Sequence, residues 1–220
     1  MAVSDIDTVV FDLDGTLVDT SYLHVVAWDA AFSAVGVEVA HHVIHRAIGM
    51  GGDRLVAAVA GEAVEKAVGD EVRSRHDALF EERIGDVHAL PGAAEVLTEL
   101  RRRGLNVVVA TSGPAEQADR LLDLVGGAHQ LHERSTNEDA EQSKPAPDVI
   151  DVALERVGGS RAVVVGDATW DARAAKERGH HMIGLLTGGI GADELIEAGA
   201  DQVFDSPAHL LDHLDQTPLA

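Results

Sequence analysis

The second half of the chain alternates between helix-like and strand-like segments, and this alternation restricts the possible folds more than any other feature. From Pro91 onward, amphipathic runs that end in glycine alternate with apolar, β-branched runs. The predicted helices are residues 92–104, 115–126, 148–159, 171–179 and 207–214. The predicted strands are 105–111, 161–167, 180–187 and 201–205, with a weaker one at 129–134. This alternation predicts an α/β fold with helices on both faces of a parallel central sheet.

The first half of the chain has a different pattern. Val9, Val10 and Phe11 close a short apolar run that predicts a buried strand. After it, the clear segments up to residue 85 are all helical: 24–36, 41–49, 53–61 and 70–85. We therefore predict one α/β core, residues 1–18 and 86–220, with a helical domain, residues 19–85, inserted after the first strand.

Two carboxylates, Asp12 and Asp14, follow this first strand directly. Ligands of parallel α/β sheets bind at the carboxyl ends of the strands, so these acids are expected to face a crevice. A polar turn would explain one acid in this place. Two acids, matched by polar residues after later strands, favour a functional site.

Thr111, Ser112 and Gly113 lie between a predicted strand and a predicted helix. Hydroxyls and free N–H groups at the start of a helix can bind an anion. A simple helix cap is the alternative for Ser112. Further along, Lys144 precedes two prolines that hold its segment extended, although an isolated Lys-Pro pair is typical of any surface loop.

Asp167 ends the strand at 161–167, and Asp171 lies near the start of the next helix, where an acid can also act only as a dipole partner. If all four aspartates gather, each pair about 4 Å apart repels by ~4 kcal/mol at an effective dielectric near 20. That is large against a typical stability of roughly 5 to 15 kcal/mol. A hard divalent cation and Lys144 would offset the repulsion, which predicts a Mg²⁺-dependent site for phosphoryl transfer.

Four segments, FDLDGTLVDT, VVVATSG, SKPAPD and VVGDATWD, occur in this order and span nearly the whole chain. Together they resemble the signature motifs of the haloacid dehalogenase (HAD) superfamily, in the branch of phosphoglycolate phosphatases and β-phosphoglucomutases. The resemblance implies a three-layer, Rossmann-like core with an inserted helical cap. Ala168 departs from the pattern, because relatives usually carry Ser there. The departure concerns one hydrogen bond of the loop or of the metal's surroundings and leaves the charges of the site unchanged.

The resemblance also implies a role for each residue. Asp12 would be the nucleophile that forms an aspartyl-phosphate, and Asp14 the general acid and base. Lys144 would be catalytic and would steady the phosphoryl group. The implied phosphate-binding residues are Thr111, Ser112, Gly113 and Lys144. The implied magnesium ligands are Asp12, Asp14, Asp167 and Asp171.

The cap is expected to select the substrate. His24, one helical turn before Trp28, is our first candidate for substrate contact or proton handling, with packing in an amphipathic helix as the alternative. Trp28 is predicted to be core. Arg54 follows a glycine-rich loop, and either contacts a second anionic group of the substrate or is solvated. We predict no metal site at the histidine groups 41, 42 and 45, 180 and 181, or 209 and 213.

The composition of the chain restricts the kinds of binding partner that we expect. The net charge of −21 argues against a nucleic-acid partner, because such binding needs clustered Lys and Arg. The chain has no cysteine, hence no disulfide or thiolate site. Neither a signal-like N-terminus nor an apolar run long enough to span a bilayer is present, which favours a cytoplasmic protein without a membrane partner. We expect a monomer or homodimer.

These observations predict a phosphatase, a Mg²⁺-dependent phosphomonoester hydrolase acting on a small phosphorylated metabolite such as a sugar phosphate or phosphoglycolate. The first alternative is a β-phosphoglucomutase-like phosphotransferase with the same core residues. The second is a non-enzymatic phosphoacceptor switch, although such a receiver does not need an inserted cap. Dehalogenation is disfavoured, because dehalogenases that resemble this chain lack the second acid, Asp14.

Overall fold

A computed structural model describes residues 6–126, 131–136 and 148–220. Its centre is a six-stranded sheet in the order β3-β2-β1-β4-β5-β6, and all neighbouring strands are parallel. The strands are β1 Thr8–Phe11, β2 Asn106–Ala110, β3 Glu133–Ser135, β4 Ala162–Gly166, β5 His181–Leu185 and β6 Gln202–Phe204. The predicted parallel sheet is confirmed, and β1 lies between β2 and β4.

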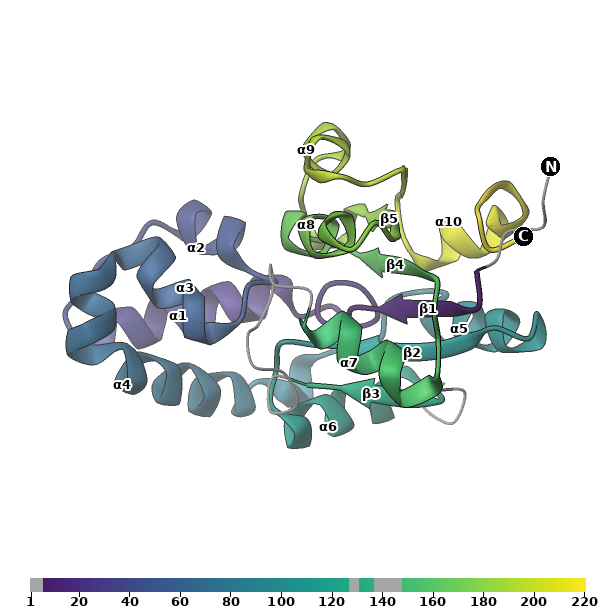
Figure 1. The fold of residues 1–220 in the computed structure, drawn as a ribbon. Helices are drawn as coiled ribbons and strands as arrows, with labels where there is room; N and C mark the ends of the chain where they lie inside the picture. The colour runs from purple at the N-terminus through teal and green to yellow at the C-terminus, as the bar shows by residue number, and fades with distance from the viewer. Residues whose placement is uncertain (1–5, 127–130, 137–147) are drawn as a thin grey trace.

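Helices cover both faces of the sheet, so the predicted three-layer α/β core is also confirmed (Figure 1). Side chains alternate along β1: Val9 and Phe11 pack with one apolar cluster, and Val10 packs with the other. The first cluster includes helices α5 Ala93–Arg102, α6 Ala115–Val125 and α10 Pro207–Asp212. The second includes α7 Asp148–Val157, α8 Thr169–Glu177 and α9 Ala192–Ala198.

The inserted helices form a separate group beyond the carboxyl end of β1 (Figure 1). They are α1 Ser21–Ala34, α2 His41–Ala47, α3 Gly52–Ala60 and α4 Glu62–Glu81. Their own apolar cluster includes Trp28, Phe32, Ile44 and Val72, so the prediction that Trp28 is core is confirmed. No helix among the described residues has the length and apolar character needed to cross a membrane.

Two chain segments connect the helical cap to the core, and they lie side by side. The N–H of Asp19 donates to the carbonyl of His88 at 2.9 Å, and the N–H of Leu90 donates to the carbonyl of Leu17 at 2.9 Å. A cap that enters and leaves through paired segments fits the proposed division into residues 1–18 plus 86–220 and residues 19–85.

Some predicted element boundaries differ from the observed ones. The helix predicted at 70–85 is the second part of α4, which begins at Glu62, because Gly69 interrupts the pattern without breaking the helix. Gly69 is buried, and a side chain there would overlap the carboxylate of Glu65. The weak strand predicted at 129–134 corresponds to the short β3, whose described residues begin later, at Glu133.

Candidate active site

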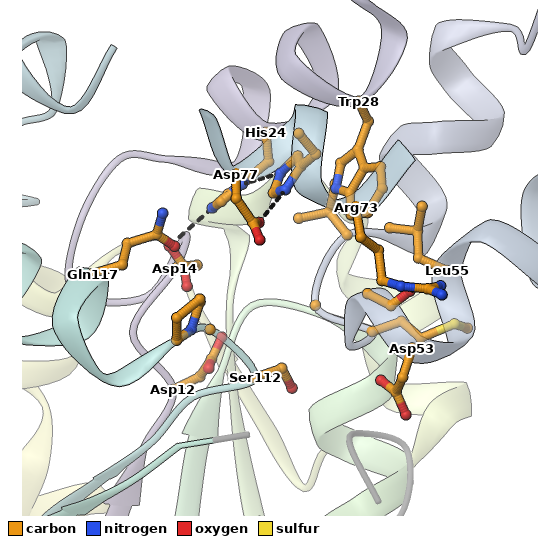
Figure 2. A pocket seen from close by; sticks show the side chains of 17 residues that line it. Asp12, Asp14, His24, Trp28, Asp53, Leu55, Arg73, Asp77, Ser112 and Gln117 are labelled. Carbon is orange, nitrogen blue, oxygen red and sulfur yellow. Dashed lines mark hydrogen bonds and ion pairs between the residues drawn. The ribbon is translucent and has the colours of Figure 1, made fainter. Parts of the chain in front are cut away.

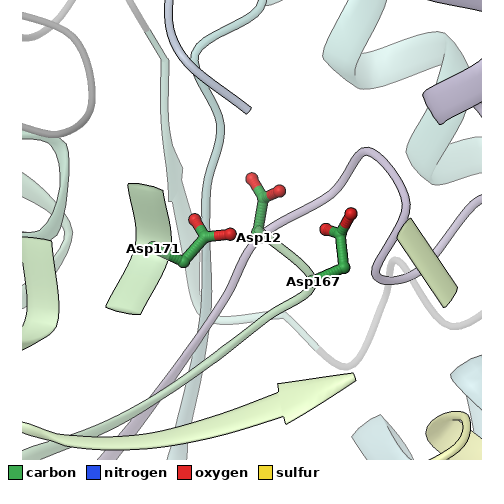
Figure 3. A group of neighbouring side chains, drawn as sticks. All are labelled: Asp12, Asp167 and Asp171. Atoms are coloured by element: carbon green, nitrogen blue, oxygen red, sulfur yellow. The ribbon is translucent and has the colours of Figure 1, made fainter. Parts of the chain in front are cut away.

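Three of the four predicted metal ligands meet at the carboxyl ends of the two central strands. Asp12 follows β1, Asp167 follows β4, and Asp171 lies in the first turn of α8 (Figure 3). One carboxylate oxygen of each lies within 4.8 Å of the others, and all three residues are buried. This is the one such group that the described part of the chain contains.

The structure around these carboxylates fits a cation. The hydroxyl of Thr16 donates to Asp167 Oδ1 at 2.8 Å, and the N–H of Ala168 donates to Asp171 Oδ2 at 3.1 Å. Gly15 adopts a φ of +73°, and a side chain on Gly15 or Gly188 would overlap Asp167. Three buried carboxylates that offer only oxygen match the ligand preference of a hard divalent cation, whose charge would offset their mutual repulsion.

The fourth predicted ligand, Asp14, does not belong to this group: its side chain contacts residues at the start of the cap. Asp14 Oδ1 accepts a hydrogen bond from the Thr20 hydroxyl at 2.8 Å and lies 3.2 Å from His24 Nε2. Thr111 Oγ1 lies 3.4 Å from Asp14 Oδ2. Although two residues apart in sequence, Asp12 and Asp14 therefore have different surroundings.

The segment after β2 has the form expected for an anion site. The N–H of Gly113 donates to Thr111 Oγ1 at 3.0 Å, which fixes the turn before α6. Ser112 Oγ is buried and has no hydrogen-bond partner among the described residues. An unpartnered hydroxyl at the edge of a cavity is suited to a phosphoryl oxygen. Lys144, the remaining predicted phosphate ligand, lies outside the described residues.

A cavity of about 320 Å³ lies between the cap and the core (Figure 2). Its core-side lining includes Asp12, Asp14, Ser112, Gly113, Pro114 and Gln117. Its cap-side lining includes His24, Trp28, Met50, Asp53, Leu55, Arg73, His76 and Asp77. The predicted cap candidate His24 therefore faces the same space as the two acids.

The other cap candidate, Arg54, is not among the residues that line this cavity. Its Nε lies 4.0 Å from Asp53 Oδ2. The arginine that lines the cavity is Arg73, which sequence reasoning did not select. Arg73 donates to both carboxylate oxygens of Glu65, at 2.8 and 2.9 Å, and to Asp70 at 2.7 Å. These hydrogen bonds, led by those that Glu65 accepts, raise the pKa of Arg73 above its usual range.

His76 is a second cap residue that the sequence analysis missed. It is buried, and its ring stacks on Trp28 with 4.0 Å between centroids. His76 Nε2 lies 3.0 Å from His24 Nδ1, and His76 Nδ1 lies 2.9 Å from Asp77 Oδ1. The signal was present in the sequence, because His76 lies four residues from both Val72 and Phe80 on the buried face of α4.

The other histidine groups have structural contacts. His45 Nε2 lies 2.8 Å from the carbonyl oxygen of Gly188, and the neighbouring Arg46 pairs with Glu194 at 2.7 Å, so the end of α2 is held against the core. His181 contacts Asp201, and His213 Nδ1 lies 2.9 Å from the His209 carbonyl. None of these residues belongs to the metal-type group found among the described residues.

A family model described as haloacid dehalogenase-like hydrolase matches residues 6–179. A phosphoglycolate phosphatase of Pseudomonas aeruginosa is 31% identical over 216 residues, covering 94% of this chain and 79% of the relative. The structure is similar to a crystal structure of a hydrolase from Pseudomonas syringae, with a TM-score of 0.90, 34% identity, and 96% and 98% of the two chains covered. The structure is also similar to that of a putative β-phosphoglucomutase from Bacteroides vulgatus, with a TM-score of 0.83 and 25% sequence identity. The match covers 98% of this chain and 91% of the other.

Proposed function

The chain belongs to the haloacid dehalogenase-like hydrolases, and on this premise we propose that it is a Mg²⁺-dependent phosphomonoester hydrolase that works through an aspartyl-phosphate on Asp12. The observation that carries the proposal is the pair of adjacent but distinct acids. Asp12 lies in the buried carboxylate group, and Asp14 lies beside it among hydrogen-bond partners from the cap. These different surroundings support Asp12 as the group that bonds phosphorus and Asp14 as the group that exchanges a proton.

Each residue has a separate part in the reaction. Asp12 attacks phosphorus, and the alcohol leaves with a proton supplied through Asp14. Water then attacks the phosphoryl group on Asp12, and Asp14 accepts a proton from that water. The N–H of Gly113 and the Ser112 hydroxyl are candidates to hold phosphoryl oxygens. Asp12, Asp167 and Asp171 would hold Mg²⁺, which would neutralise charge on the phosphoryl oxygens.

The cap-side lining supports an uncharged, hydroxylated leaving group. Among the described lining residues, Asp53 and Asp77 contribute carboxylates, and the guanidinium of Arg73 is already engaged by Glu65 and Asp70. A second carboxylate on the substrate would approach like charges there, whereas sugar hydroxyls could donate to them. We therefore favour a sugar or polyol phosphate over phosphoglycolate.

A panel of phosphorylated metabolites, assayed for released phosphate with and without Mg²⁺, tests the proposal. We expect release that requires Mg²⁺, with kcat/KM higher for sugar and polyol phosphates than for phosphoglycolate. No release from any substrate, p-nitrophenyl phosphate included, would contradict the assignment as a hydrolase.

A second candidate is a β-phosphoglucomutase-like phosphotransferase, which the similarity to the putative β-phosphoglucomutase supports. In that case the cap would shelter the aspartyl-phosphate from water long enough to phosphorylate an intermediate. Turnover of a sugar monophosphate that depends on a bisphosphate activator would favour the phosphotransferase, whereas phosphate release without an activator favours the hydrolase.

A further inference from the structure

Arg73 is the one Arg or Lys among the described residues that line the cavity between cap and core (Figure 2). Its Nη1 donates to Glu65 Oε2 at 2.8 Å and to the carbonyl of Gly52 at 3.2 Å. Its Nη2 donates to Glu65 Oε1 at 2.9 Å and to Asp70 Oδ1 at 2.7 Å. Each terminal nitrogen of an arginine carries two N–H groups, so these donors already have acceptors within the cap.

Glu65 is the stronger of the two acidic partners of Arg73. The side chains of Glu65 and Arg73 are each 24% exposed, whereas that of Asp70 is fully exposed. A paired contact through both carboxylate oxygens is stronger and more directional than a single one, and a single contact with a solvated acid contributes little. Glu65 is not among the residues that line the cavity. It therefore affects the cavity through Arg73.

The sequence of α4 leaves space for this pair. Glu65 and Arg73 are eight residues apart, and Gly69 lies midway between them on the helix. A β-carbon on Gly69 would lie only 2.6 Å from the nearest oxygen of the Glu65 carboxylate. Glycine in the interior of a helix costs stability, so its presence fits a need for space where Glu65 extends toward Arg73.

This contact changes what the cavity offers to a substrate. An arginine recognises a carboxylate best when it presents two N–H groups side by side. Glu65 occupies that pair of donors and neutralises their charge, while Asp53 and Asp77 add carboxylates to the lining. Loss of the Glu65 carboxylate would return both the donors and a positive charge to the cavity.

We propose that Glu65 is a positioning residue that determines specificity: it holds Arg73 so that the cavity rejects a second anionic group on the substrate. This inference rests on the proposed hydrolase, because it concerns the leaving group of the phosphomonoester. Phosphoglycolate, which ends in a carboxylate, is then a poorer substrate than 2-hydroxyethyl phosphate, which ends in an alcohol. The discrimination lies in binding of the leaving group, so it should appear mainly in KM.

The test measures kcat/KM for these two substrates, which differ only in the terminal group. Wild type should favour 2-hydroxyethyl phosphate. Glu65→Gln keeps the shape of the side chain but removes its charge and one acceptor. The ratio of kcat/KM for phosphoglycolate to that for 2-hydroxyethyl phosphate should rise at least about tenfold, mainly through a lower KM for phosphoglycolate. In the double variant Glu65→Gln/Arg73→Met this gain should disappear, because the guanidinium is gone.

Gly69→Ala disturbs the same contact without a change of charge. The added methyl group should displace the Glu65 carboxylate from Arg73, while alanine favours the helix. We expect the ratio to rise in the same direction, by about threefold or more.

Glu71→Gln is the matched control, because Glu71 is an exposed acid of the same helix that pairs with Arg75 at 2.7 Å. It removes the same charge and should leave the ratio within about twofold of wild type, since solvent and salt screen an exposed charge.

An unchanged ratio in Glu65→Gln would overturn the proposal, and if that variant does not fold, the ratio in Gly69→Ala decides in the same way. An equal rise in Glu71→Gln, or a wild type that already prefers phosphoglycolate, would also overturn it. A wild-type enzyme that releases phosphate from neither substrate nor p-nitrophenyl phosphate would instead contradict the proposed function.

Discussion

Surroundings, more than residue type, separate the proposed roles of the acids in this site. Asp12 is 4% exposed and lies among carboxylates, while Asp14 contacts two hydroxyls and an imidazole. Similarly, His76 and His24 are adjacent rings, but His24 contacts Asp14 whereas His76 contacts the exposed Asp77. Substitution of each of these residues should therefore impair the protein in a different way.

Asp12→Asn should abolish phosphate release from p-nitrophenyl phosphate, because an amide cannot serve as the nucleophile. The fold should persist, since the backbone N–H of residue 12 still donates to Val165. Phosphate release and thermal unfolding followed by circular dichroism would be measured on the same sample. Activity within a few-fold of wild type would remove Asp12 from this role.

His76 should make the protein less stable in mild acid. Its pKa is lowered to about 4 in the folded protein, against 6.5 for the model group, so the unfolded chain binds more protons between these values. The free energy of unfolding should thus fall as pH decreases from 6.5 to 4, by up to roughly 3 kcal/mol from this residue. The free energy of unfolding, measured with urea at several pH values across this range, should fall less steeply with pH in His76→Phe than in wild type. An equally steep fall in both proteins would refute the assignment of the lowered pKa to His76.

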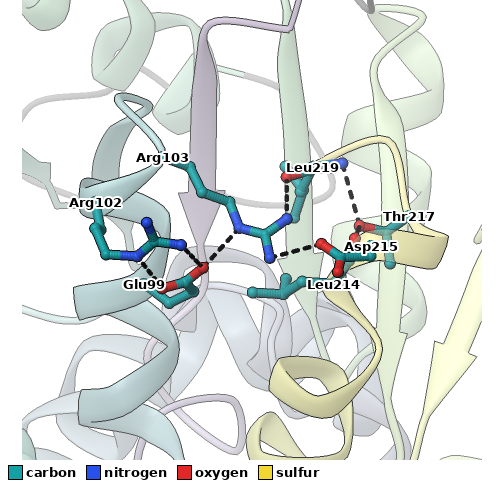
Figure 4. Close-up of polar contacts among 7 residues, drawn as sticks. All are labelled: Glu99, Arg102, Arg103, Leu214, Asp215, Thr217 and Leu219. Atoms are coloured by element: carbon teal, nitrogen blue, oxygen red, sulfur yellow. Dashed lines mark hydrogen bonds and ion pairs between the residues drawn. The ribbon is translucent and has the colours of Figure 1, made fainter.

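At the scale of the element, a charge cluster joins α5 to the C-terminal segment (Figure 4). Glu99 accepts hydrogen bonds from Arg102 at 2.6 and 2.7 Å and from Arg103 at 2.9 Å. Arg103 also contacts Asp215 at 2.8 Å and donates to the Leu219 carbonyl at 3.1 Å. Hydrogen bonds from Arg102 and then Arg103 lower the pKa of Glu99 to about 2.

A lowered carboxyl pKa stabilises the fold above the unfolded value of 4.5, and the benefit is lost as pH falls toward 2. Glu99→Gln should therefore lower the melting temperature at pH 7 by a few degrees, and less in high salt. The difference from wild type should shrink steadily below pH 4.5. A difference that does not depend on pH would point to altered packing of α5.

The central strands were predictable because β2, β4 and β5 are apolar runs with β-branched residues, bounded by polar turns. The carboxylate group was predictable for a related reason, since parallel strands bring their carboxyl ends together. The cap-side lining of the cavity could not be predicted from the sequence. Arg73 and His76 come from α4, and only the tertiary packing of the cap brings them to the cavity that Asp14 also lines.

For the whole molecule, the buried carboxylates should link the stability of the core to the proposed cation. Asp12 lies far in sequence from Asp167 and Asp171, and unfolding would relieve the repulsion among the three carboxylates. Excess Mg²⁺ should raise the melting temperature of the chelator-treated protein, because the ion binds only the folded site.

The variant Asp171→Asn tests whether Mg²⁺ stabilises the protein by binding at these carboxylates. It removes one negative charge, so the metal-free variant should melt at or above the wild-type temperature, and Mg²⁺ should shift it much less. Differential scanning calorimetry with chelator and with Mg²⁺ measures both effects. Equal Mg²⁺ shifts in variant and wild type would place the ion elsewhere.

Asp12 as the carrier of the phosphoryl group is the claim on which the rest depends. Acid quench during turnover of the best substrate, followed by borohydride reduction and peptide mass spectrometry, tests it most directly. Our account predicts homoserine at position 12 and unmodified aspartate at position 14. Substrate turnover with aspartate intact at position 12, or with the reduced residue at another position, would contradict it.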